Sequence, residues 1–300
     1  MAEILMKNQL TIVVPAYNEA ETLSTYVYEL DSFCVENKIE LIIVNDGSSD
    51  NTKDILEKAS SDLRSTFKLI NHKINKGYGA ALKTGLSNVN TQFAVTMDSD
   101  GQHRFEDVLK LKEQQNLTDS DMVIGSREIN SSGLYRAIGK KIIKKFVKMV
   151  ARADLKDLNS GLKYYKTDLV KRYLKLCPDS MAFSEIITLT FLTQKHLVTE
   201  IDIQVNDRVN GVSTINTKTA FEAILEVINL VMLFEPARIF FPVSFFFFLM
   251  GMAWGLPIII SGQGVSVGAS LLLLFSVMVF LVGLLATQLS YIRRDIALNN

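Results

Sequence analysis

The chain has 300 residues, of which 48% are hydrophobic, and its 32 basic and 32 acidic residues give a formal net charge of +0. This balance leaves no general electrostatic footprint for nucleic acid, so we expect no nucleic-acid partner. Cys34 and Cys177 have no CxxC spacing, which argues against a disulfide framework or a zinc site. The length suits one large domain or two units.

The first two thirds of the chain alternate predicted strands with helical segments. Apolar, often β-branched runs predict the strands, and helical segments follow the first three of them. This alternation implies a mostly parallel sheet covered on both faces. The predicted strands are residues 10–14, 39–44, 67–70, 93–97, 122–125, 162–165 and 198–205.

Asp98 and Asp100 come directly after the apolar run 93–97 and precede Gly101. Residues i and i+2 of a strand share a face, so the two carboxylates converge. A divalent cation relieves their repulsion, and Mg²⁺ prefers carboxylate oxygens and substrate phosphates. The pair therefore predicts a metal–diphosphate site. A solvated Asp-Ser-Asp-Gly turn is the alternative.

Polar side chains also follow other predicted strands. Asn18 and Glu19 follow the first strand, Asp46 the second and Arg127 the fifth. Open α/β sheets bind ligands outside the carboxyl ends of their strands. We expect amide and acidic groups there to hold a base and ribose, and the arginine to hold a phosphate.

Gly77-Tyr78-Gly79 opens a predicted helix. The third glycine of a dinucleotide fingerprint is replaced by Leu82. Close backbone packing is therefore the favoured interpretation, and it is compatible with a helix N-terminus facing a phosphate.

The segment 139–150 carries apolar residues at helical spacing and lysines on the other face, which is typical of a helix on a membrane surface. Residues 157–161 form a polar turn that is also consistent with a plain connector. Arg208 stands in a glycine-containing loop, either to close over a phosphate or as an ordinary surface arginine. Residues 221–234 predict an apolar helix.

Residues 239–292 contain no charged residue. This length allows two membrane spans joined by the turn 261–264, since each needs roughly 20 apolar residues. Arg238, Arg293 and Arg294 flank the two ends, so the positive-inside rule places both ends in the cytosol. The first ten residues lack the apolar core of a signal peptide.

Six motifs occur together in a recognisable order and resemble those of family 2 glycosyltransferases of the GT-A fold. The resemblance is narrower to the branch of dolichol-phosphate mannose synthase and the bacterial polyprenyl-phosphate glucosyltransferases. It implies an α/β fold: a mostly parallel, Rossmann-like GT-A catalytic domain followed by a two-helix transmembrane hairpin. The motifs are Pro15-Ala16-Tyr17-Asn18-Glu19, Asn45-Asp46-Gly47-Ser48-Ser49-Asp50, Asn75-Lys76-Gly77-Tyr78-Gly79-Ala80, Asp98-Ser99-Asp100-Gly101-Gln102-His103, Gly125-Ser126-Arg127 and Asp157-Leu158-Asn159-Ser160-Gly161.

The resemblance also implies a division of the chain. We expect a cytosolic GT-A domain at residues 1–217, with an amphipathic membrane-surface helix at about 136–151. A juxtamembrane helix at 218–237 precedes the transmembrane region 238–292, with spans at about 239–261 and 265–289. The tail 293–300 is expected in the cytosol.

The resemblance assigns roles to particular residues. Asp98, Asp100 and Gln102 would hold Mg²⁺ or Mn²⁺, and Asp100, Asp157, Arg127 and Arg208 would serve catalysis, with Asp157 either a base or a positioning group. Arg136, Lys140 and Ser213 would meet the lipid phosphate, although Lys140 stands where some relatives carry serine. The nucleotide-sugar donor would contact Pro15, Tyr17, Asn18, Glu19, Asp46, Lys76, Gly77 and Asp98.

The expected activity is that of an inverting glycosyltransferase in the bacterial inner (plasma) membrane, with its catalytic domain and both termini in the cytoplasm. It would move a sugar from a donor of the UDP-glucose or GDP-mannose type to undecaprenyl phosphate. A processive polysaccharide synthase is the alternative, but the only tryptophan, Trp254, lies inside a predicted span rather than in a Gln-x-x-Arg-Trp motif. A catalytically silent membrane scaffold should have lost its paired acids. Self-association is a further expectation.

Overall fold

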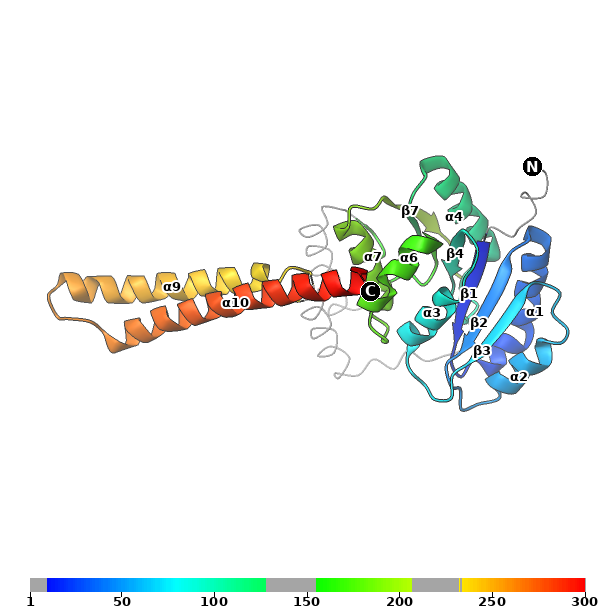
Figure 1. Cartoon of the computed structure of the whole chain (residues 1–300), viewed down its shortest axis with the longest axis horizontal. Coiled ribbons are helices and arrows are strands. Elements are labelled where there is room, and N and C mark those ends of the chain that lie inside the picture. The colour runs from blue at the N-terminus through cyan, green and yellow to red at the C-terminus, as the bar shows by residue number, and fades with distance from the viewer. Residues whose placement is uncertain (1–9, 128–154, 207–231, 233, 300) are drawn as a thin grey trace. The chain divides into compact units, whose positions relative to one another are not determined.

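The computed structural model describes residues 10–127, 155–206, 232 and 234–299. Seven strands in the described part form one sheet with the order β3-β2-β1-β4-β6-β5-β7 (Figure 1). The strands are β1 (Leu10–Ala16), β2 (Glu40–Asn45), β3 (Phe67–Asn71), β4 (Phe93–Thr96), β5 (Met122–Arg127), β6 (Lys163–Lys166) and β7 (Val198–Ile203).

Strand β6 runs antiparallel to both of its neighbours, β4 and β5, and the other neighbouring pairs are parallel. The mostly parallel sheet that the sequence predicts is therefore confirmed, whereas the reversal of β6 was not predicted. Strand β1 extends two residues beyond its predicted end. Pro15 is in register with Val44, one residue from the strand end, where a missing N–H donor costs little.

Helices cover both faces of the sheet. Alternate residues such as Ile12 and Val14 point into a core that they share with Leu23 of α1 and Leu56 of α2. Figure 1 shows α3 on the opposite side of β1–β3 from α1 and α2. The helices are α1 (Ala20–Asn37), α2 (Thr52–Ala59), α3 (Tyr78–Ser87), α4 (Phe105–Thr118), α6 (Thr167–Tyr173) and α7 (Phe183–Thr193), with a short 3₁₀ helix, η2 (Leu174–Leu176).

The chain divides into two compact units, Met1–Ile215 and Asn216–Asn300. In the second unit, α9 (Ala237–Ile260) and α10 (Val267–Asn299) are both long and apolar enough to cross a membrane. The hydroxyls of Ser244 and Ser276 each donate a 2.9 Å hydrogen bond to the other residue's carbonyl. Such reciprocal bonds satisfy polar groups between two apolar helices.

Helix α10 continues well beyond the predicted end of the second span, because residues 290–299 contain no glycine or proline to stop it. Most of the predicted juxtamembrane helix and all of the basic segment 136–151 lie outside the described residues. The predicted domain boundaries therefore stay predictions.

Candidate active site

The carboxyl ends of β1, β2 and β4 meet at one edge of the sheet because these strands are parallel. A cavity of about 300 Å³ opens there. It gathers side chains from segments that are distant in sequence. Its lining consists of Pro15, Ala16, Tyr17, Glu19, Asp46, Asn75, Tyr78, Ala81, Asp98, Ser99, Asp100 and Met181.

Asp98 lies just beyond the end of β4 and is held from three sides. The Tyr78 hydroxyl donates a 2.8 Å hydrogen bond to its Oδ1, and Nε2 of the buried His103 lies 3.5 Å from its Oδ2. Gly161 approaches from the third side, where a Cβ would overlap the Asp98 carboxylate. The carboxylate is therefore fixed in place by its surroundings.

These contacts also set the charge of Asp98. Burial tends to raise the pKa of this carboxyl, but His103, Tyr78 and Arg127 outweigh that effect and hold its pKa below the usual range. Burial and the neighbouring Asp98 raise the pKa of Tyr78 well above its ordinary value. Asp98 is thus an anion beside a neutral hydroxyl donor near neutral pH.

Asp100 shares the cavity with Asp98, as the spacing of the two residues predicts. Its Oδ1 accepts a 3.2 Å hydrogen bond from the backbone N–H of Gln102. The Gln102 carbonyl accepts in turn from the N–H of Asn206, which follows β7. This bond ties the loop that carries Asp98 and Asp100 to the segment after the edge strand β7. The role of the Gln102 side chain in metal binding stays a prediction.

Asp46 is buried and organises the loop before α3. Its carboxylate accepts hydrogen bonds from the N–H groups of Lys76 (3.0 Å) and Gly77 (2.8 Å), and it lies 2.6 Å from His72 Nδ1. A Cβ at Gly77 would overlap the carbonyl of Asp179. Of these residues Asp46 lines the cavity, and the contact of Asp46, Lys76 and Gly77 with a nucleotide stays a prediction.

The loop after β1 is joined to the loop after β2. Asn18 adopts a left-handed backbone with φ of 54°, and its side-chain oxygen accepts a 2.8 Å hydrogen bond from the N–H of Ser49. The N–H of Glu19 donates to the hydroxyl of Thr52 at the start of α2. The two loops thereby hold Tyr17, which is 45% exposed, at the rim of the cavity. A flat, exposed ring there is suited to stacking on a planar base.

Arg127 ends β5 and forms a two-pronged ion pair with the buried Asp157. Its Nε donates to Oδ2 at 2.8 Å and its Nη2 to Oδ1 at 3.4 Å. Asp157 also accepts from the N–H of Asn159, and this contact fixes the turn that follows. Because the ion pair orients the guanidinium, the sequence-predicted Arg127 and Asp157 act as one unit rather than as two independent groups.

The cavity fits a hard divalent cation. Asp98 and Asp100 supply carboxylate oxygens, while no three His, Cys, Asp or Glu side chains among the described residues form a complete metal cage. Two carboxylates with room for water and phosphate oxygens are typical of Mg²⁺ and Mn²⁺ sites that bind a diphosphate.

Sequence reasoning missed Tyr78 as the partner of Asp98, and it missed Met181 and Lys163. Only one of them had a local signal: Lys163 stands between the apolar Leu162 and the aromatic pair Tyr164 and Tyr165. Four predicted site residues lie outside the described part of the chain. These are Arg136, Lys140, Arg208 and Ser213.

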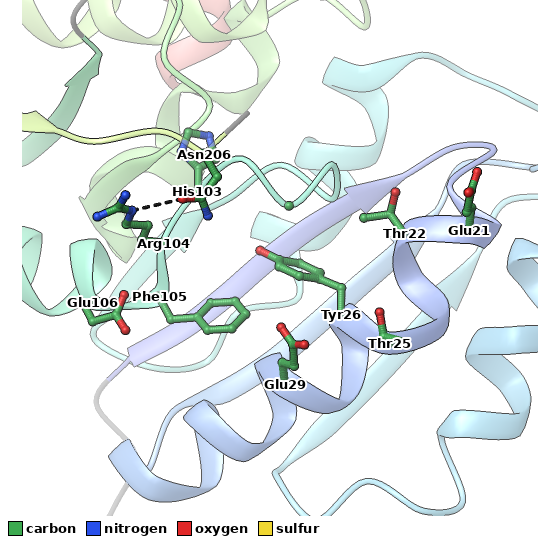
Figure 2. Close-up of a pocket in the computed structure, with 11 residues that line it drawn as sticks. Glu21, Thr22, Thr25, Tyr26, Glu29, His103, Arg104, Phe105, Glu106 and Asn206 are labelled. Atoms are coloured by element: carbon green, nitrogen blue, oxygen red, sulfur yellow. Dashed lines mark hydrogen bonds between the residues drawn. The ribbon is translucent and has the colours of Figure 1, made fainter. Parts of the chain in front are cut away.

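A second cavity, of about 320 Å³, is lined by Gly101 and His103, which follow Asp100, and by residues of α1 (Figure 2). Figure 2 shows α1 contributing Tyr26 and Glu29, and the start of α4 contributing Phe105. Arg104 bonds to Asn206 at its edge. This cavity backs the loop that carries Asp100, and none of the predicted donor-binding residues lines it.

Similar proteins agree with this architecture. The chain is 25% identical over 301 residues to the undecaprenyl-phosphate 4-deoxy-4-formamido-L-arabinose transferase of Pseudomonas syringae pv. syringae, covering 95% of this chain and 87% of that protein. It is 28% identical over 207 residues to the protein of the same name from Photorhabdus laumondii, covering 68% of this chain. That match spans only 62% of the relative's own length.

A solved structure of glucosyl-3-phosphoglycerate synthase from Mycobacterium tuberculosis, in complex with Mn²⁺, UDP and glucosyl-3-phosphoglycerate, has the same fold. The TM-score is 0.57 at 15% identity, over 74% of this chain and 80% of that one. Residues 235–292 match the family described as GtrB C-terminal hairpin, and residues 11–174 match the family described as Glycosyl transferase family 2. Because the latter match covers more than half of the chain and the fold agrees with it, the chain belongs to glycosyl transferase family 2.

Proposed function

We propose that this protein is a membrane-bound, inverting glycosyltransferase that moves a sugar from a nucleotide-diphosphate sugar to undecaprenyl phosphate. The observation that carries the proposal is the convergence of Asp98, Asp100 and Tyr17 on one cavity at the carboxyl edge of the sheet. A charged diphosphate and a planar base both find complementary groups there. UDP-linked sugars and GDP-mannose are the candidate donors.

The donor diphosphate would lie between the acidic pair and the arginine. Mg²⁺ or Mn²⁺ held by Asp98 and Asp100 would offset the charge that develops on the leaving diphosphate. Arg127, oriented by Asp157, would add charge-assisted hydrogen bonds to phosphate oxygens. Tyr78 would keep Asp98 turned toward the cavity.

The charge of the acceptor phosphate would make a general base dispensable. A phosphate monoester has a second pKa near 6, so its oxygens are largely anionic at pH 7. One of them would attack the anomeric carbon directly, forming a carbon–oxygen bond as the bond to the leaving diphosphate breaks, and this displacement inverts the configuration. Asp157 is bound by Arg127 and by the turn after it, which supports a positioning role for this residue.

The hairpin of α9 and α10 supports membrane attachment, since both helices meet the length and hydropathy of a membrane span. The relatives named above act, by their names, on undecaprenyl phosphate, a lipid that such a hairpin would accompany in the bilayer. The arginines at the ends of the hairpin favour a cytoplasmic catalytic domain and a cytoplasmic C-terminus. Arg136, Lys140, Arg208 and Ser213 would meet phosphate groups of acceptor or donor.

An acceptor comparison tests this function. Purified protein in detergent receives Mn²⁺ and a panel of UDP- and GDP-sugars with either undecaprenyl phosphate or undecaprenol, and mass spectrometry identifies the lipid products. We expect a sugar-bearing lipid phosphate with one donor and no product from undecaprenol. Equal transfer to both lipids would contradict a phosphate acceptor, and no transfer to either by folded protein would contradict the proposed function.

A further inference from the structure

Lys163 is a fully buried lysine on β6, the strand between β4 and β5. It is the first residue of β6 and is in register with Thr96 of β4 and Ile124 of β5. These two strands lead into Asp98 and Arg127. Because β6 is antiparallel, its beginning lies at the edge where its neighbours end. Lys163 therefore stands between the two halves of the site.

The ammonium group of Lys163 joins two segments that are distant in sequence. Its Nζ donates a 2.8 Å hydrogen bond to the carbonyl of Leu158 and another to the carbonyl of Ser184. Leu158 directly follows Asp157, the partner of Arg127. Ser184 lies in the first turn of α7, three residues beyond Met181 in the cavity wall. One side chain thus fixes the Asp157 turn against the segment that carries Met181.

Neighbouring charged groups act on the protonation of Lys163. Burial lowers its pKa to about 7, Asp157 and Glu185 act against that effect, Arg127 adds to it, and the buried Cys177 contributes least. The two carboxylates therefore favour the ammonium form against the cost of burying it. A buried lysine is costly, and an apolar residue of similar size would fill the same space more cheaply if packing were its only purpose.

We propose that Lys163 is a positioning residue for sugar transfer: its ammonium fixes the Asp157 turn and thereby holds the Arg127 guanidinium in the orientation that meets phosphate. The inference rests on the proposed function in treating Arg127 as a phosphate contact. Without the ammonium, the Leu158 carbonyl would lose its donor and the Asp157 turn would lose its tie to α7. A shift of that turn would move Asp157, and the Arg127 guanidinium paired with it would lose its orientation.

The test compares the full-length wild type with Lys163→Met, Lys163→Arg and Leu56→Ala in detergent. Leu56 is buried in α2 and lines neither cavity, so its truncation controls for lost stability. We expect Lys163→Met to lower kcat/KM about 100-fold, the scale of a misplaced reacting group. Lys163→Arg should recover at least about a tenth of the wild-type value, and Leu56→Ala should stay within about threefold of it. A folded Lys163→Met protein that transfers as well as Leu56→Ala would overturn the inference.

Hydrogen exchange separates this inference from the proposed function. Amides of residues 155–162 should exchange faster in Lys163→Met than in the wild type and Lys163→Arg, whatever the donor. A wild type that transfers no sugar would count against the proposed function alone, and unchanged exchange in Lys163→Met would count against the role of Lys163. If Lys163→Met does not fold, Lys163→Gln replaces it, since its amide donates hydrogen bonds without charge. Wild-type transfer by Lys163→Gln would contradict the need for a cation.

Discussion

The hydroxyl of Tyr78 and the Oδ1 of Asp98 lie 2.8 Å apart, joining the first residue of α3 to the loop that follows β4. The neutral hydroxyl can only donate to an anionic carboxylate, so the bond selects the orientation in which Asp98 faces the cavity. A partner of this kind behind a metal-binding carboxylate orients it and tunes its affinity.

Tyr78→Phe should therefore weaken the binding of the metal ion without unfolding the protein. We expect the Mn²⁺ concentration for half-maximal transfer to rise about tenfold, the lower range for loss of such a partner. A metal titration of transfer activity measures this. Tyr28→Phe, on the exposed side of α1, should leave the titration unchanged. Identical curves for the two variants would contradict the role of Tyr78.

Gly161→Ala should displace the Asp98 carboxylate, because Gly161 packs directly against it. The added Cβ would occupy the space of the Asp98 carboxyl group, and either the turn or Asp98 must move. We expect transfer to fall about 100-fold. A Cβ at Gly262, in the hairpin turn, meets nothing within 4 Å, so Gly262→Ala is the matched control and should lower stability only through its positive φ. Equal rates for both variants would exclude close packing at Gly161 as the cause.

Met181 should contact the donor. Its side chain is 67% exposed although it lines the cavity, and binding of a donor would cover it. Since apolar contacts of this size contribute about 1–3 kcal/mol, Met181→Ala should raise the donor KM about tenfold. Leu117→Ala, at a 74% exposed position on α4, should not. Donor KM values from initial rates decide the matter, and equal values for the two variants would remove Met181 from the donor site.

Lys163 should make stability depend on pH. Its pKa is about 7 in the folded protein against an ordinary 10.5. Between these values the unfolded chain binds more protons than the folded one, so the free energy of unfolding rises with pH, by at most about 1.4 kcal/mol per pH unit. Unfolding followed in detergent between about pH 7 and about pH 10 should show this rise in the wild type.

Lys163→Met should lose that part of the slope, whereas Lys166→Met should retain it. Lys166 lies on the same strand, but its ammonium pairs with Asp119 and Asp121 and is partly exposed. Its pKa is raised, chiefly by the hydrogen bond to Asp119. The same slope in the wild type and Lys163→Met would mean that Lys163 keeps its proton throughout this range.

Much of the fold follows from local patterns. Apolar β-branched runs such as 39–44 become β2, and the spacing of Asp98 and Asp100 brings both into one cavity because strand ends fix their direction. The reversal of β6 could not be predicted, because it depends on pairing with β4 and β5 after a long intervening segment. No short-range periodicity carries that information.

The site residues that the sequence did not predict also depend on contacts between segments that are distant in sequence. Tyr78 reaches Asp98, and Lys163 reaches Ser184, across folded segments rather than along one element. Asp46 illustrates the converse, since its place after β2 was predicted, but the bonds it accepts from Lys76 and Gly77 depend on how a distant loop folds back. Positions at strand ends were therefore predictable, while hydrogen-bond partners were not.

Metal-dependent transfer from a nucleotide sugar at the Asp98–Asp100 pair is tested most directly by measuring the lipid-linked sugar that variants form. The wild type, Asp100→Asn and Asp119→Asn are compared in the presence of Mn²⁺ and undecaprenyl phosphate. Asp119 is exposed and does not line the cavity, and its left-handed backbone tolerates asparagine. We expect Asp119→Asn to match the wild type and Asp100→Asn to lose at least about 100-fold, as loss of several kcal/mol of charge stabilisation requires. Undiminished transfer by Asp100→Asn, or transfer that persists when a chelator removes all divalent metal, would contradict the claim.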